Sequence, residues 1–164
     1  MRRLGRGVII ILIVVLAGIQ LLPYGRDHAN PPVRGEPRWD SPRTRELAVR
    51  ACFDCHSNET RWPWYSNVAP LSWLIQRDVR DGRRHLNFSE WDRPQSEARE
   101  AARAMQHGAM PPSYYTALNR SAELSESDWE ALVAGLTATL GTSQERSGEH
   151  ESKAGRMNTT FQRS

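Results

Sequence analysis

Residues 41–56 read SPRTRELAVRACFDCH. Ser41 is a favourable N-cap and Pro42 a favourable first residue for an α-helix, and the apolar residues that follow recur on one helical face. The stretch therefore predicts a helix that runs directly into the motif CFDCH at residues 52–56. Two cysteines three positions apart on a helical turn project to the same side.

This CxxCH spacing suits covalent attachment of haem. In proteins of the c type, two thiols add across the porphyrin vinyl groups and the next histidine ligates the iron. We therefore predict that Cys52 and Cys55 attach one haem c and that His56 is the proximal iron ligand. The alternatives are a disulfide, a thioredoxin-like pair, which is typical of a βαβ context, and half of a zinc site. Zinc would need further ligands from His85, His107 or carboxylates, which occur at no recognised spacing.

A second axial ligand is expected from the loop Gly-Ala-Met-Pro-Pro at residues 108–112. Two prolines follow Met110 and restrict the backbone, so that this methionine can face the iron in a fixed direction. Methionine ligation raises the reduction potential of a haem. His107 is the rival ligand and would lower that potential, whereas Met105 is expected to pack in the core. We predict Met110 as the distal ligand.

Apolar residues recur at helical spacing in three further stretches, residues 70–81, 93–107 and 126–140. Gly82 and Gly108 are expected to end the first two of these helices, and Ser125 to cap the start of the third. No stretch alternates with the period of two that a strand would need. The sequence thus predicts an all-α fold, a small cytochrome c-like helical domain over residues 41–141.

The chain begins with three arginines and an uncharged apolar run over residues 8–22, the pattern of an export signal. No small-residue cleavage pattern follows, which favours an uncleaved transmembrane anchor over residues 1–24. The arginines would stay in the cytoplasm, so the domain would lie on the outer side of a bacterial inner membrane. We expect a Pro-rich linker over residues 25–40 and a disordered polar tail over residues 142–164.

The composition limits the other possibilities. The chain has 164 residues, 38% apolar and 25% charged, which fits one globular domain rather than a polytopic membrane protein. Its formal net charge is +3, and three of these charges come from arginines within the first six residues. The remainder is formally neutral, so we expect no nucleic-acid partner.

Aromatic and basic residues near the motif give weaker indications. Trp64 and Tyr65 follow the cysteines closely and are candidates to line a haem, although core packing explains most of the aromatic residues equally well. Arg80, Arg83 and Arg84 could bind haem propionates or an acidic redox partner. A solvated helix end explains these arginines more simply.

The segment over residues 47–136 resembles the haem-binding domain family of bacterial membrane-anchored proteins related to c-type cytochromes. The resemblance is carried by CxxCH at residues 52–56, by Trp-Pro-Trp-Tyr-Ser at residues 62–66 and by Met-Pro-Pro at residues 110–112. It implies a bound haem and says little about biological role. A long aromatic insertion after His56 distinguishes the chain from small cytochromes.

These features predict a membrane-anchored monohaem electron carrier, rather than an enzyme, that passes single electrons between redox partner proteins. One alternative is a haem-based sensor with an exchangeable distal site, which would have a ligand-responsive spectrum. Another is an exported interaction domain with a simple disulfide, which would have no Soret band. A peroxidase would need a distal acid–base residue, and only His85 or His107 could provide one.

Overall fold

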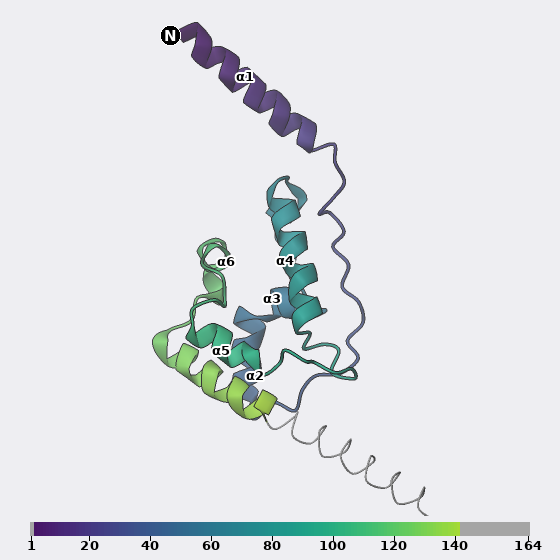
Figure 1. Cartoon of the computed structure of the whole chain (residues 1–164), viewed down its shortest axis with the longest axis vertical. Coiled ribbons are helices and arrows are strands. Elements are labelled where there is room, and N and C mark those ends of the chain that lie inside the picture. The colour runs from purple at the N-terminus through teal and green to yellow at the C-terminus, as the bar shows by residue number, and fades with distance from the viewer. Residues whose placement is uncertain (1, 142–164) are drawn as a thin grey trace, which may run out of the picture.

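The structure is a computed structural model that describes residues 2–141; the predicted tail over residues 142–164 lies outside the described residues. Within these limits the chain forms helices and turns without a strand, so the predicted all-helical fold is confirmed (Figure 1). The α-helices are α1 (Arg2–Ile19), α2 (Pro42–Ala51), α3 (Phe53–His56), α4 (Leu71–His85), α5 (Glu100–Gln106), α6 (Ser113–Leu118) and a last helix over residues 126–141. Two 3₁₀ turns lie between them, η1 (Trp64–Asn67) and η2 (Arg120–Ala122).

The start of α2 follows the sequence prediction. The hydroxyl of Ser41 accepts a hydrogen bond from the backbone N–H of Thr44 at 3.2 Å, which satisfies one of the free donors in the first helical turn. The helix breaks at Cys52 and resumes as α3. The Cys52 carbonyl accepts bonds from the N–H groups of Cys55 (3.1 Å) and His56 (2.9 Å), so the CxxCH motif forms a compact turn of its own.

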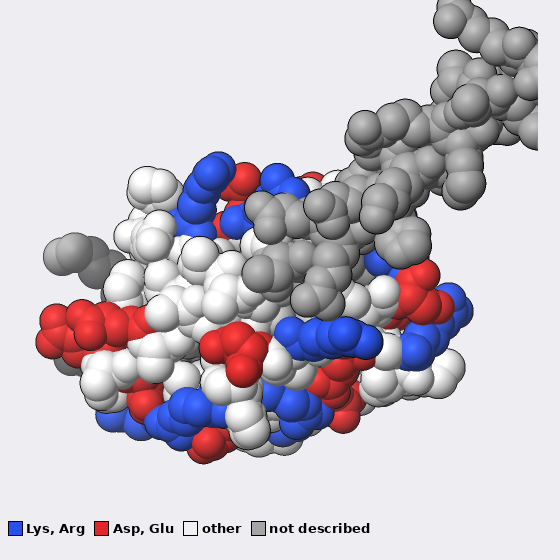
Figure 2. Space-filling view, turned by 90° about the horizontal axis from the view of Figure 1, so that it is seen from below, with Lys and Arg blue, Asp and Glu red and all other residues white. Residues whose placement is uncertain are grey.

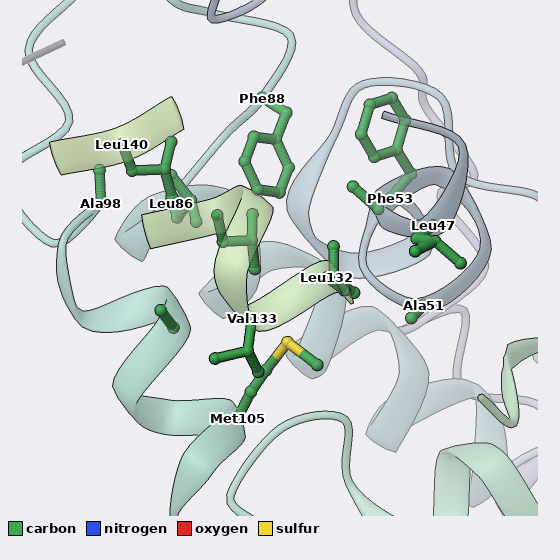
Figure 3. Packing of buried hydrophobic residues seen from close by; sticks show 13 residues of the cluster. Leu47, Ala51, Phe53, Leu86, Phe88, Ala98, Met105, Leu132, Val133 and Leu140 are labelled. Carbon is green, nitrogen blue, oxygen red and sulfur yellow. The ribbon is translucent and has the colours of Figure 1, made fainter. Parts of the chain in front are cut away.

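The hydrophobic core joins α2, α3 and the last helix to the α4–α5 connection and to α5 (Figure 3). Phe53 from the CxxCH turn stacks on Phe88, with ring centroids 5.6 Å apart. Met105 of α5 belongs to this core, as expected, and is only 2% exposed. The buried apolar side chains include Leu47, Phe53, Leu86, Phe88, Ala98, Met105, Leu132, Leu136 and Leu140.

Residues 25–40, predicted as a linker, lie along the folded domain. The N–H of Arg34 donates to the Ser89 carbonyl at 2.8 Å, and the ring of Trp39 lies 5.2 Å from that of Phe88. Further back, the side-chain amide of Gln20 exchanges two hydrogen bonds with the backbone of Ala69, at 2.9 and 3.0 Å. This segment therefore contributes contacts to the domain and is not a free tether.

Helix α4 is longer than the predicted 70–81, and the expectation that Gly82 ends it is wrong. Gly82 lies inside α4 and against the CxxCH turn, where a Cβ atom would collide with the backbone carbonyl of Cys55. A glycine is needed here because two backbones approach each other closely. Gly82 thus permits α3 to pack directly on α4.

The later helices differ from the prediction mainly at their boundaries. Helix α5 starts at Glu100 and not at residue 93, because residues 96–99 form turns. Gly108 follows its end with a φ of 68°, as a glycine stop signal predicts. The last helix starts after Ser125, whose hydroxyl accepts from the N–H of Asp128 at 3.2 Å.

The predicted transmembrane anchor over residues 1–24 is not supported. None of the helices within the described range is both long and apolar enough to cross a bilayer. Helix α1 ends at Ile19 and carries the arginines in its first turns, so its uncharged part covers only residues 7–19. At a rise of about 1.5 Å per residue this part is roughly 20 Å long, against a hydrocarbon core of about 30 Å.

Candidate haem-binding site

A cavity of about 690 Å³ lies among α3, α4, α5 and α6. Its volume is in the range of small-molecule and cofactor sites, and most of its wall is apolar. The four predicted site residues, Cys52, Cys55, His56 and Met110, all line it. Aliphatic side chains from several elements complete the walls, among them Leu71, Leu74, Ile75, Val79, Leu86, Ala104 and Leu118.

His56 is held in one orientation by the backbone of α4. Its Nδ1 lies 3.1 Å from the carbonyl oxygen of Gly82 and 3.1 Å from that of Leu86. Carbonyls only accept hydrogen bonds, so Nδ1 carries the proton and Nε2 keeps its lone pair. Burial lowers the pKa of His56, which keeps the imidazole neutral. A buried neutral histidine with Nδ1 bonded to a carbonyl is a typical metal ligand through Nε2.

The two cysteines are free thiols on the wall of the cavity. Burial raises the pKa of Cys52 to about 12, and it is also the main cause that raises the pKa of Cys55 to about 12. Neither group is therefore an activated thiolate of the kind that redox-active cysteine pairs need. The thioredoxin-like interpretation is disfavoured by these pKa values, as it is by the helical fold.

The distal wall comes from the segment between α5 and α6. Met110 lines the cavity and is 40% exposed, whereas His107 lies on the surface at the end of α5, away from the cavity lining. His85 also reaches the cavity wall, where its Nδ1 lies 2.8 Å from a carboxylate oxygen of Glu97. The structure thus brings Met110, and not its rival His107, into the same cavity as His56.

Asp54, inside the CxxCH motif, is a site residue that the sequence analysis missed. Its side chain is 11% exposed and accepts hydrogen bonds from the backbone N–H and the guanidinium of Arg61 at 3.1–3.2 Å. Its Oδ2 also accepts from the hydroxyl of Tyr115 at 2.8 Å and from the amide of Asn119 at 3.4 Å. Asp54 therefore links the CxxCH turn to α6. A charged residue between two cysteines was the only signal in the sequence.

Tyr114 forms a second link across the cavity. Its hydroxyl donates to Oδ2 of Asp78 on α4 at 2.8 Å. Burial is the main cause that raises the pKa of Tyr114 to about 12, and burial also raises the pKa of Asp78. The two adjacent tyrosines after Met-Pro-Pro therefore fasten α6 to two different elements, which no local sequence pattern indicates.

Of the remaining residues singled out in the sequence, one lines the cavity and four do not. Tyr65 lines the cavity as predicted, but Trp64 is 80% exposed and lies outside the lining. Arg80, Arg83 and Arg84 do not line the cavity either. Arg83 donates to the Ser57 carbonyl at 2.8 Å and so supports the fold instead. On the surface shown in Figure 2, acidic and basic side chains are interspersed.

A zinc site gains no support from the geometry. Across residues 2–141, no three His, Cys, Asp or Glu side chains gather closely enough to hold a metal ion by themselves. The CxxCH turn offers one imidazole and two thiols pointing into an apolar space. This donor set fits a porphyrin better than a bare cation, because a porphyrin brings four iron ligands and an apolar body of its own.

The half-buried His56 keeps the lone pair of Nε2 beside two thiols in an apolar cavity, and this arrangement suits a haem-binding protein. The comparison with protein families agrees with this class. Residues 14–138 match the family described as the haem-binding domain, and the chain belongs to this family. Neither the curated proteins nor the solved structures contain a match to the chain.

Proposed function

We propose that the chain is a monohaem c-type cytochrome domain that carries single electrons and is not an enzyme. Cys52 and Cys55 would hold one haem c through thioether bonds, and His56 and Met110 would be the side chains that ligate its iron. When bound, the haem supplies a one-electron iron couple. The observation that carries this proposal is the commitment of His56 Nδ1 to two carbonyls in a cavity that also contains both thiols and Met110.

The protein residues would tune this couple in three ways. The carbonyls of Gly82 and Leu86 hold the imidazole of His56 in position and increase its basicity as a ligand. The aliphatic walls exclude water, which favours the iron state of lower charge. A methionine sulfur from Met110 favours the ferrous state and so raises the potential further.

The first test is covalent attachment. The full chain is expressed with a cytochrome c maturation system, and the haem is quantified as the pyridine haemochrome after acid-acetone extraction. We expect one haem that stays with the protein, and none in Cys52→Ala/Cys55→Ala. His107→Ala is the matched control and keeps the haem. A wild-type chain without a Soret band would contradict the proposal and favour an exported interaction domain with a disulfide.

We also propose an extracytoplasmic location, at the outer side of a bacterial inner membrane, where the domain exchanges electrons with partner proteins. This rests on the basic residues and apolar run at the start of the chain, the pattern of an export signal. A reporter enzyme that is active only outside the cytoplasm, fused after residue 141, tests the location. We expect activity from the fusion that contains residues 1–141, and loss of activity when residues 1–24 are deleted.

A haem-based sensor is the second candidate function. It is favoured by the 40% exposure of Met110 and by the absence of any buried residue on α6. Such a protein would exchange its distal ligand for a small molecule. Carbon monoxide added to the ferrous protein distinguishes the two candidates, because rapid and complete binding indicates an exchangeable site, whereas a stable Met110 ligand slows it.

A further inference from the structure

The segment that carries Met110 is held to the domain mainly by hydrogen bonds. No residue of helix α6 is fully buried, so hydrophobic burial alone does not fix its position. At one end the N–H of Met110 donates to the Ala104 carbonyl of α5 at 3.2 Å. Figure 1 shows α6 standing apart from α4. The side chains that span the cavity between α6 and the opposite wall must therefore determine where the methionine lies.

One of these side chains reaches the haem-attachment turn itself. Tyr115 donates to Asp54, and Asn119 donates both to Asp54 and, at 3.0 Å, to the Tyr115 oxygen. Burial raises the pKa of Tyr115, so its hydroxyl remains a proton donor. Asp54 is fixed in turn by Arg61. The acceptor is thus also held by Arg61, and the donor comes from α6.

We propose that Asp54 is a positioning residue for the distal ligand: through Tyr115 it holds the α6 segment over the cavity, and so determines how firmly Met110 binds the iron. The inference rests on the proposed function, because it needs a haem with Met110 as ligand. It adds that the residue between the two cysteines connects the proximal attachment turn to the distal loop.

The size of the effect follows from an equilibrium between a closed segment, with Met110 on the iron, and an open one. An added ligand such as imidazole binds only the open form, so its apparent affinity is proportional to the open fraction. Removal of one buried hydrogen bond changes such an equilibrium by about tenfold. The conservative variant Asp54→Asn keeps an oxygen that can accept from Tyr115 and should behave almost as the wild type.

The experiment uses the full chain with haem attached by the maturation system. Imidazole is titrated into the ferric protein, and the weak far-red charge-transfer band of sulfur-ligated iron is recorded. In Tyr115→Phe we expect the dissociation constant for imidazole to fall about tenfold and the band to weaken, with haem content unchanged. Tyr24→Phe is the control, because Tyr24 is exposed, lies outside the cavity lining and has no described hydrogen-bond partner for its hydroxyl.

Three outcomes would contradict the inference. Suppose that the dissociation constant for imidazole in Tyr115→Phe stays within about twofold of the wild-type value while Met110→Ala binds imidazole tightly. Met110 is then still supported as the iron ligand, but the positioning role of Asp54 is contradicted. If Tyr24→Phe has the same effect as Tyr115→Phe, the effect is not specific to Tyr115. If Met110→Ala changes neither the dissociation constant for imidazole nor the charge-transfer band, Met110 is not the iron ligand. Both the proposed ligand and this inference are then wrong. Should Tyr115→Phe fail to accumulate, Asn119→Ala weakens the same contact and must show a smaller shift in the same direction.

Discussion

Nδ1 of His56 lies 3.1 Å from the carbonyl oxygen of Gly82, 26 residues further along the chain. The orientation of the His56 imidazole is therefore set by another helix and not by the CxxCH turn that contains it. This contact exists because Gly82 has no side chain and lets the backbone of α4 approach that of Cys55. Orientation by a backbone carbonyl is a common way to fix both the tautomer and the basicity of a ligating histidine.

The first prediction concerns the close approach of the α4 backbone at Gly82 to the backbone of Cys55. In Gly82→Ala the added methyl group meets the Cys55 carbonyl and must separate α3 from α4. We expect the free energy of unfolding to decrease by about 1–3 kcal/mol, measured by urea denaturation. Gly141→Ala is the control, since no atom of the described residues lies within 4 Å of a Cβ built there. An equal loss in both variants would contradict the role of the α3–α4 contact.

The second prediction concerns the distal ligand and the reduction potential. Met110→Ala should keep its covalent haem and lose the far-red charge-transfer band. Its potential should drop by on the order of 0.1 V, within the roughly 0.8 V range over which axial ligands tune haem. His107→Ala should leave the potential unchanged. The opposite pattern in a spectroelectrochemical titration would identify His107 as the ligand.

The third prediction concerns pH. Burial raises the pKa of Asp78 above its ordinary value of 3.8, so the folded chain binds this proton more tightly than the unfolded chain does. The stability from this group is present below pH 3.8 and is lost as the pH rises through the folded-state pKa. Asp78→Asn, which still accepts from Tyr114, should therefore gain in unfolding free energy relative to the wild type between pH 4 and 7.

The unfolding free energy of an Asp128 variant should show the opposite pH dependence in the same measurement. The hydrogen bond from Arg43 lowers the pKa of Asp128, so its stabilising effect is present above pH 3.8 and is lost as the pH falls. In Asp128→Asn the unfolding free energy relative to the wild type should therefore decline from pH 3 to 7. Parallel trends in the two variants would show that burial of Asp78 does not govern its titration.

The fourth prediction tests the core. Leu132 is fully buried in the cluster that joins the last helix to α2. Leu132→Ala should reduce the free energy of unfolding by about 2–5 kcal/mol, because the cavity that it leaves cannot close completely. The matched variant Leu21→Ala changes a residue that is 84% exposed and should cost less than about 0.5 kcal/mol.

The sequence allowed the helical class and the proximal motif to be predicted, because helical periodicity and CxxCH are local patterns. The Met-Pro-Pro loop was likewise recognised from local composition, and Met110 lies on the cavity wall. Gly82 was misread because a glycine near a helix end and a glycine at a close contact between backbones have the same local signature. Only the tertiary structure separates these two cases.

The contacts that cross the cavity could not be predicted for a related reason. Tyr115 and Asp54 are 61 residues apart, and nothing in either neighbourhood indicates the other. The linker predicted over residues 25–40 rests on their proline and glycine content, which describes backbone stiffness and not tertiary contact. The packing of Trp39 against Phe88 depends on the surface that the rest of the chain provides.

The close approach at Gly82 also defines the smallest transferable form of this site. The pentapeptide CFDCH, grafted onto a helix of another protein, would present two thiols and an imidazole but would not hold that imidazole in place. The carbonyls of Gly82 and Leu86 belong to α4 and to the residue that follows it, and α4 packs on the turn only because position 82 has no side chain. For protein engineers, the unit to transplant is therefore a pair of helices and their contact, and the familiar five-letter motif is only one half of it.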